Sequence, residues 1–390
     1  MMAAGASPAG IILWMEHAGR IRSARLPLAL GLAIAGVAFL VLAAFALDRT
    51  RGWGFDVEAY LWAAQRVSLG ESPYWEYTLE GPFNPGPWGL YLYAPPLAVG
   101  FVPLAGLSQP VAILAWYLLR VGLLALGCWA LPVRPAVRLL VLAVGAVSQP
   151  VIVDLVLGNV SVLVFFLLAL VWRGLDRPWG AIPLALALSI RPTLGIVLLW
   201  SLIRRRLRVV AATLLAGLVL VLVTIPVVGF AGYLDWLTVL GNVSQVAGVS
   251  HNLDLASTLL RLDLAPEVAT AGLYAGYLIA IVAVLLSLRR DRDTSFIVTT
   301  MATLLLAPLL WDHYLVALLL PAAFLAERGR TWGLALPLLA WLPAPLIPIV
   351  AIAATLLPFL GDGAGRPGSP GAAPAVDRPW RLLRGARPAA

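Results

Sequence analysis

Residues 296–325 read FIVTTMATLLLAPLLWDHYLVALLLPAAFL, and this stretch indicates the class of protein. It is an apolar run longer than the roughly 20 residues that one membrane crossing takes. Four residues interrupt it, Trp311-Asp312-His313-Tyr314. A charged side chain at mid-bilayer costs about 2.5–3.5 kcal/mol on insertion scales, so such residues are kept mainly where they face a cavity or a substrate. The stretch therefore predicts a membrane protein with a functional site at this interruption.

Composition supports the same class. Of 390 residues, 61% are hydrophobic and 12% are charged, against about 25% charged in soluble domains. We predict an all-α polytopic membrane protein with about 10–12 transmembrane helices, several of them short or broken. The net charge of +8 is explained by Arg residues clustered in short loops, and we expect no nucleic acid partner. Cys128 is the only cysteine, which excludes disulfides and Cys-based metal sites.

The chain divides into three predicted parts. Residues 1–25 form a cytoplasmic N-terminus, residues 26–360 the transmembrane domain, and residues 361–390 a disordered tail rich in Gly, Pro, Ala and Arg. The first span, 26–47, is too long for a signal-peptide core. Later apolar segments are expected near 94–107, 110–131, 139–153, 160–172, 179–203, 209–228, 268–288, 295–310, 314–326 and 331–360. Helix breaks are expected at Gln149-Pro150, Gly158-Asn159 and Arg191-Pro192, and such breaks are tolerated at membrane depth where they line a cavity.

Orientation follows from the Arg clusters, which mark cytoplasmic loops. They are Arg20/Arg22/Arg25, Arg204-Arg205-Arg206 with Arg208, and Arg289-Arg290 with Arg292. The loop 48–93 is net acidic and follows the first span, so it lies outside. The loop 229–265 lies between two cytoplasmic clusters, each one span away, and is also outside. One span after Arg292 the chain reaches Trp311-Asp312-His313, so three segments meet on the extracytoplasmic side.

Asp56 comes directly after the first span. One interpretation is that it caps a helix over Glu58–Val67. A capping box would need Glu or Gln at Ala59, and neither is there. The other interpretation is a general base at the membrane surface, and the other outward-facing polar residues favour it.

His313 is the second candidate catalytic residue. It can donate to a phosphate or carry a proton, and Asp312 is expected to orient it. The alternative is that both are interfacial residues beside Trp311 and Tyr314, since aromatic side chains favour that level. Apolar helices flank the turn with no loop to solvate it, which favours a His313 that faces substrate.

Three further polar groups have two interpretations each. Arg191 interrupts the apolar stretch 179–203 and either binds phosphate or pairs with an acid such as Asp154. Gly158-Asn159 is first a helix-breaking turn and second a ligand contact. His251-Asn252, with Asp254, belongs either to a functional outer loop or to ordinary solvated surface. The acidic motif Asp291-Arg292-Asp293 is expected to be a solvated loop.

The order of these residues resembles the GT-C type membrane glycosyltransferases, and specifically glycosyltransferase family 87, which includes bacterial α-mannosyltransferases. The resemblance covers roughly residues 27–330. Its motifs are Asp56 with Tyr60, Gly70, Pro73-Tyr74, Tyr93-Ala94-Pro95-Pro96, Gly158-Asn159, Arg191-Pro192-Thr193, Arg204-Arg205-Arg206, and Pro308 with Trp311-Asp312-His313-Tyr314. The chain departs from the family pattern at Asn159, where members usually have Gln, and at Arg191, where they usually have Lys.

The resemblance implies transfer of a sugar, most simply mannose, from a polyprenyl-phosphate donor to an envelope glycolipid or glycan. It places the enzyme in the plasma membrane, with its multi-pass fold and an extracytoplasmic active site. Asp56 would be the base and His313 would act at the phosphate, with inversion at the anomeric carbon and no metal or other cofactor. The expected substrate-binding residues are Glu58, Tyr60, Tyr74, Tyr93, Asn159, Arg191, His251, Asn252, Trp311 and Asp312.

Other functions stay open from the sequence. Arabinofuranosyl transfer shares the lipid-phosphate donor. A transporter or flippase of lipid-linked sugars also has broken helices and intramembrane charges, although no inverted repeat is visible, the first outer loop has 46 residues and the polar residues gather on one face. A non-catalytic partner in an envelope complex is the third alternative.

Overall fold

The computed structural model describes residues 30–34, 36–37, 53–81, 90–243, 252–341 and 346–357. The chain separates into residues 1–356 and residues 357–390, and the description below concerns the first unit. The predicted N-terminus 1–25 and tail 361–390 lie outside the described residues, as do most of the predicted first span and His251. The predicted division into domains stays a prediction.

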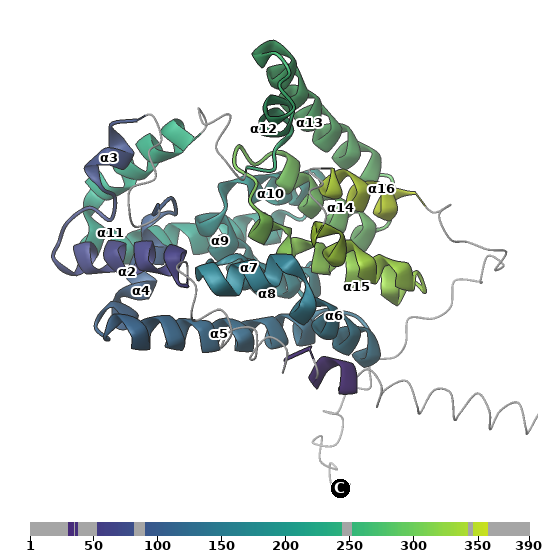
Figure 1. Ribbon diagram of the computed structural model, residues 1–390, viewed down its shortest axis with the longest axis horizontal. Helices are drawn as coiled ribbons and strands as arrows, with labels where there is room; N and C mark the ends of the chain where they lie inside the picture. Colours follow the sequence, from purple (N-terminus) through teal and green to yellow (C-terminus); the bar gives the residue numbers. More distant parts are fainter. Residues whose placement is uncertain are drawn as a thin grey trace, which may run out of the picture. The chain divides into compact units, whose positions relative to one another are not determined.

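Every regular element in the described ranges is a helix (Figure 1). The α-helices are α2 (Phe55–Ser68), α3 (Glu76–Leu79), α4 (Pro95–Ala105), α5 (Gln109–Ala130), α6 (Pro135–Val147), α7 (Gln149–Leu157), α8 (Ser161–Arg173), α9 (Ala181–Ile190), α10 (Gly195–Ile203), α11 (Leu207–Val243), α12 (Leu255–Arg261), α13 (Pro266–Ser287), α14 (Arg292–Leu305), α15 (Leu319–Glu327) and α16 (Ile347–Leu356). The 3₁₀ helices are η1 (Pro178–Gly180), η2 (Pro192–Leu194), η3 (Asp312–Leu318) and η4 (Thr331–Trp341).

Among the described residues, three helices are long and apolar enough to cross a membrane: α5, α11 and α13. The pair α6 and α7, bent by 61° at Ser148, passes the same test of length and composition when taken together, as a broken span or a re-entrant loop does. Shorter apolar helices, among them α4, α8 and α16, accompany them. The chain is therefore an all-α polytopic membrane protein with several short or broken helices, as predicted.

The predicted helix breaks are confirmed. Pro150 stands in the first turn of α7, where a missing N–H costs nothing. Gly158 ends α7 in the left-handed region at φ 83°, which Gly adopts without strain. Arg191 is extended, because a residue before Pro disfavours the helical region. The second outer loop differs from the prediction, because residues 230–243, expected in that loop, continue α11 beyond a kink at Gly229.

The Arg clusters 204–208 and 289–292 lie side by side. Arg204 donates to the carbonyl oxygens of Leu288 (3.2 Å) and Arg290 (3.0 Å). Arg206 and Arg292 both form ion pairs with Asp176. We call this group of loops the basic end, and its residues are Asp176, Arg204, Arg206, Leu288, Arg290 and Arg292.

The broken segments lie one helix length away from the basic end. α8 runs from Ser161 toward the basic end, and α14 runs away from it, from Arg292 to Leu305. Ser161, which follows the Gly158-Asn159 break, and the Trp311–Tyr314 turn, which follows α14, therefore share the opposite end. The candidate site is built there.

Candidate functional site

Two glycines place Asp56. The N–H of Gly54 donates to the carbonyl of Val156 at the end of α7 (2.8 Å). A Cβ on Gly158 would lie 2.8 Å from the Cβ of Val57, so only Gly allows α2 to start this close to α7. The helix begins at Phe55 with Gly54 as its N-cap. The capping interpretation of Asp56 is therefore wrong, and its carboxylate is available for another partner.

A chain of hydrogen bonds connects Asp56 to Arg191. Asn159 donates from Nδ2 to Asp56 Oδ2 (2.7 Å), and its Oδ1 accepts from the hydroxyl of Ser161 (3.1 Å). The guanidinium of Arg191 in turn donates to the Ser161 hydroxyl oxygen. Residues from α2, the α7–α8 break and the α9–η2 break thus form one network.

Arg191 is a buried cation, 8% exposed. Its guanidinium carbon lies 3.7 Å from the centre of the Tyr314 ring, a cation–π contact. It forms no ion pair with any residue that the structure describes, and its Nε is buried without a hydrogen bond there. The alternative pairing with Asp154 is wrong, because Asp154 pairs with Arg120 (3.5 Å). Arg191 is therefore available to a buried anion.

His313 lies beside this cation. The imidazole is 3% exposed, and its Nε2 is buried with no hydrogen-bond partner in the described part of the chain. Its ring packs against Tyr314 (5.1 Å between centroids) and Trp311 (5.6 Å). Asp312 does not orient it, since its carboxylate accepts from Gln149 of α7 instead (3.2 Å). A buried polar atom without a partner is costly, so His313 Nε2 is suited to a ligand.

Three of the tyrosines predicted to bind substrate are buried and joined by hydrogen bonds. Tyr60 donates to the hydroxyl of Tyr93 (3.2 Å), and Tyr74 donates to the carbonyl of Tyr93 (2.6 Å). Asn159 also donates to the Tyr93 hydroxyl (3.3 Å). Tyr93 is thus joined to the site directly through Asn159, Tyr60 through the Tyr93 hydroxyl, and Tyr74 only through the backbone of Tyr93.

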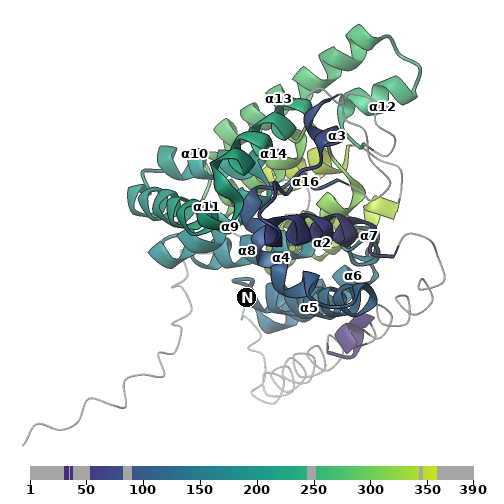
Figure 2. The same ribbon diagram turned by 90° about the vertical axis from the view of Figure 1, so that its left-hand side faces the viewer.

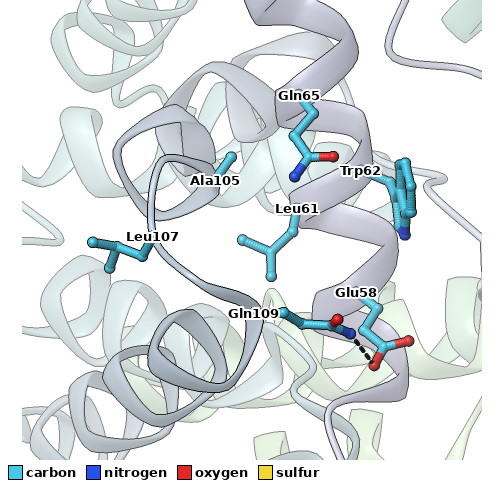
Figure 3. A pocket seen from close by; sticks show the side chains of 7 residues that line it. All are labelled: Glu58, Leu61, Trp62, Gln65, Ala105, Leu107 and Gln109. Atoms are coloured by element: carbon cyan, nitrogen blue, oxygen red, sulfur yellow. Dashed lines mark hydrogen bonds between the residues drawn. The ribbon is translucent and has the colours of Figure 1, made fainter.

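Glu58 lies on the other face of α2 from Asp56. Two residues correspond to about 200° around a helix of 3.6 residues per turn. Its carboxylate accepts from Gln109 (2.7 Å), and it borders a hollow between α2 and the α4–α5 turn (Figure 3). Glu58, which was expected to bind substrate, therefore lies apart from Asp56.

Asn252 supports the Trp311–Tyr314 turn from behind. It is fully buried, donates to the carbonyl of Pro308 (3.2 Å), and accepts from the N–H of Leu310 (2.9 Å). Pro308 lies three residues before Trp311, and Leu310 lies one residue before it. Its neighbour His251 lies outside the described residues.

Asp56 has the electrostatics of a base. α2 is not among the helices that are long and apolar enough to cross a membrane. Burial among the surrounding helices raises the pKa of Asp56 to about 6, against the opposing effects of the Asn159 hydrogen bond and the charge of Arg120. As a residue, Asp56 is only partly buried. A general base works best with a pKa near the working pH, and Asp56 meets that condition.

Sequence reasoning overlooked Ser161, Arg120 and the role of Asp154. Asp154 Oδ1 accepts from the N–H of Ser161 (2.7 Å), and Arg120 donates to the carbonyls of Asp154 and Leu155 (3.0 Å to the latter). This pair fastens the end of α7 to α5 and positions Ser161. A signal was present, because Arg120 is the only charged residue of α5.

Comparison with known proteins adds one match. The model of glycosyltransferase family 87 matches residues 91–311, more than half of the chain. The matched range includes Tyr93, Asn159 and Arg191, while Asp56 precedes it and His313 follows it. No curated protein matches the chain.

Proposed function

The chain belongs to glycosyltransferase family 87, and on that premise we propose that it transfers mannose from a polyprenyl-phosphate donor to an envelope glycolipid or glycan. The observation that carries the proposal is the network from Asp56 through Asn159 and Ser161 to Arg191. The network connects the carboxylate of Asp56 to the buried guanidinium of Arg191, and the two groups do not form an ion pair. Such a site offers a base at one end and an anion position at the other.

The proposed reaction is a single displacement. Asp56 takes the proton of the acceptor hydroxyl, whose oxygen forms a bond to the anomeric carbon. The bond from that carbon to the phosphate oxygen breaks, and its electron pair leaves with polyprenyl phosphate. One base suffices because the leaving group is already a phosphate, and the displacement inverts the anomeric centre.

Arg191 and His313 would act on the departing phosphate. Preorganised donors in a site without water stabilise developing negative charge more strongly than they would in solvent. Arg191 has an unpaired Nε and His313 an unpaired Nε2 among the described residues, so each has capacity for a phosphate oxygen. We propose that this pair replaces a metal ion and that no cofactor takes part.

The side of the membrane is also a proposal. The basic end holds two Arg clusters, and Arg-rich short loops face the cytoplasm. The candidate site lies one helix length from that end, so we place it on the extracytoplasmic side of the plasma membrane.

The experiment is transfer in vitro by the purified chain in lipid. Radiolabelled polyprenyl-phosphate mannose is supplied with extracted envelope glycolipids, and EDTA is added in a parallel reaction. Labelled product in both reactions supports the proposal. If only polyprenyl-phosphate arabinofuranose gives product, the transferred sugar is arabinofuranose and not mannose. Loss of product in EDTA contradicts the metal-free mechanism. Movement of labelled donor across sealed vesicles without product supports a transporter instead.

A further inference from the structure

The outward face of α2 borders a hollow that the proposed reaction does not use. Its lining comes from α2 and the α4–α5 turn: Glu58, Leu61, Trp62, Gln65, Ala105, Leu107 and Gln109 (Figure 3). Its volume is about 110 Å³, well below the ~300–1,000 Å³ of pockets for drug-sized ligands. We call it the outer hollow. It suits one small unit of a longer ligand.

The lining has the chemistry of a carbohydrate site. Glu58, Gln65 and Gln109 supply a carboxylate and two amides, and these groups can both accept from and donate to hydroxyls. Glu58 and Gln109 are already joined at 2.7 Å, which fixes their positions. Trp62 and Leu61 supply an apolar wall. A sugar ring has hydroxyls around its edge and C–H groups on its faces, so it matches both kinds of surface.

An aromatic strip continues from the hollow toward α3. The ring of Trp62 lies 6.2 Å from that of Trp75, and Trp75 stacks on Tyr77 at 6.2 Å and 15°. Trp62 is 38% exposed. The guanidinium of Arg66 lies over the Trp75 ring, 4.7 Å from its centre, so Trp62 is the member of this group that offers the main surface to a sugar ring. We name Trp62, Trp75 and Tyr77 the aromatic strip.

The position of the hollow fits an acceptor. Glu58 is two residues from Asp56 on the same helix, and Trp62 is about 9 Å farther along the helix axis than Asp56. Asp56 and the hollow therefore lie within the length of a short oligosaccharide of each other along α2. α2 and α4 lie side by side in both views (Figures 1 and 2).

We propose that the outer hollow and the aromatic strip form a subsite for the acceptor glycan, which holds the sugar units that precede the accepting one. This inference rests on the proposed function in taking the acceptor to be a glycan. A membrane-surface face would be rich in Lys and Arg. Here the only basic residue on the outward side of α2 is Arg66, which pairs with Glu71 (3.1 Å).

The test measures oligosaccharide binding without donor, so that it does not depend on catalysis. The full chain in lipid nanodiscs is titrated with soluble manno-oligosaccharides of increasing length and with arabinofurano-oligosaccharides, followed by saturation-transfer NMR. We expect longer oligosaccharides to bind at least ten-fold more tightly than the monosaccharide. Trp62→Ala should abolish that advantage and Trp62→Phe should keep most of it. The matched control is Trp179→Ala, which removes an equally exposed Trp (38%) from η1 near the basic end.

The outcomes separate the two proposals. Equal binding by Trp62→Ala and the wild type overturns the subsite. So does quenching of Trp62 by brominated lipids that oligosaccharide does not relieve, which would make this face a membrane contact. Length-dependent binding in a protein that transfers no sugar overturns the proposed function and keeps the subsite.

Discussion

Asn159 donates a hydrogen bond of 2.7 Å from its side-chain amide to the carboxylate of Asp56. The same amide accepts from the backbone N–H of Val160 (2.7 Å) and from the hydroxyl of Ser161, so its orientation is fixed. Asn159 follows Gly158, whose left-handed backbone turns the chain out of α7. The helix break is thus what brings an amide to the carboxylate.

Asp56→Asn should abolish transfer. The amide cannot take a proton, and general base catalysis is typically worth about 10²–10⁴-fold, so we expect a loss of at least 10² in kcat/KM. The measurement is transfer from labelled donor by purified variants matched for thermal stability. Glu71→Gln, which removes an exposed acid near the other end of α2, should keep full activity. Activity retained in Asp56→Asn contradicts the assigned base and leaves the family membership intact.

The pH profile should have an acidic limb near pH 6. The pKa of Asp56 is raised to about 6, and only the ionised carboxylate is a base. Activity should therefore be constant above pH 7 and fall about ten-fold per pH unit well below the pKa. The measurement is kcat/KM between pH 4.5 and 8. A flat profile from pH 5 to 7 would show that a different group, or a different rate-limiting step, governs the reaction.

Asn159→Ala should move that limb to higher pH. The Asn159 hydrogen bond stabilises the ionised carboxylate and lowers its pKa against the effect of burial, so without it the acid form persists to higher pH. A merely structural role would lower activity equally at every pH. Asn242→Ala is the control, since Asn242 binds the carbonyls of Thr78 and Leu79 away from the site. The acidic limb of the pH profile of Asn242→Ala should stay at the wild-type pH.

Part of this arrangement could be predicted from the sequence because local chemistry dictates it. Pro150 and Pro192 lack a backbone N–H, and Gly158 adopts a positive φ, so each interrupts a helix independently of its tertiary surroundings. The breaks therefore coincide with the predicted ones. The start of α2 was predicted three residues too late because Gly54 replaces a side-chain cap.

Other features depend on packing that the sequence does not display. Glu58 was expected at the site with Asp56, but two residues on a helix are about 200° apart and point to different faces. Asp312 resembled a partner for His313 because the two are adjacent, but adjacent residues on a helix point in different directions. The partner of Arg120 is 34 residues away, and only the α5–α7 contact brings them together.

Arg191 and Tyr314 should act as a pair on the donor. Arg191→Lys keeps the charge but loses the planar group that lies over Tyr314, so we expect the KM for donor to rise at least ten-fold. Tyr314→Phe keeps the ring and should be nearly neutral. Tyr314→Leu removes a cation–π contact worth about 0.5–2 kcal/mol, or about 2- to 30-fold. Equal KM values for Tyr314→Phe and Tyr314→Leu would show that the contact does not position Arg191.

The pair Arg120 and Asp154 should be the strongest single determinant of stability near the site. The two side chains are 1% and 0% exposed, and removal of one partner from a buried pair costs about 3–5 kcal/mol. Arg120→Met should therefore lower the thermal midpoint sharply in nanodiscs, and transfer should fall with it because Ser161 and Asn159 lose their support.

The double variant Arg120→Met/Asp154→Asn should recover part of this loss. Asn carries no charge and still accepts from the N–H of Ser161, as Asp154 does at 2.7 Å. A non-additive cycle of this kind identifies a direct interaction. The control is Arg134→Met, which breaks a pair with Glu327 at 3.0 Å whose side chains are 64% and 31% exposed and should cost no more than about 1 kcal/mol. If the double variant is as unstable as the sum of its single variants, Arg120 acts through the carbonyls of α7 rather than through the charge of Asp154.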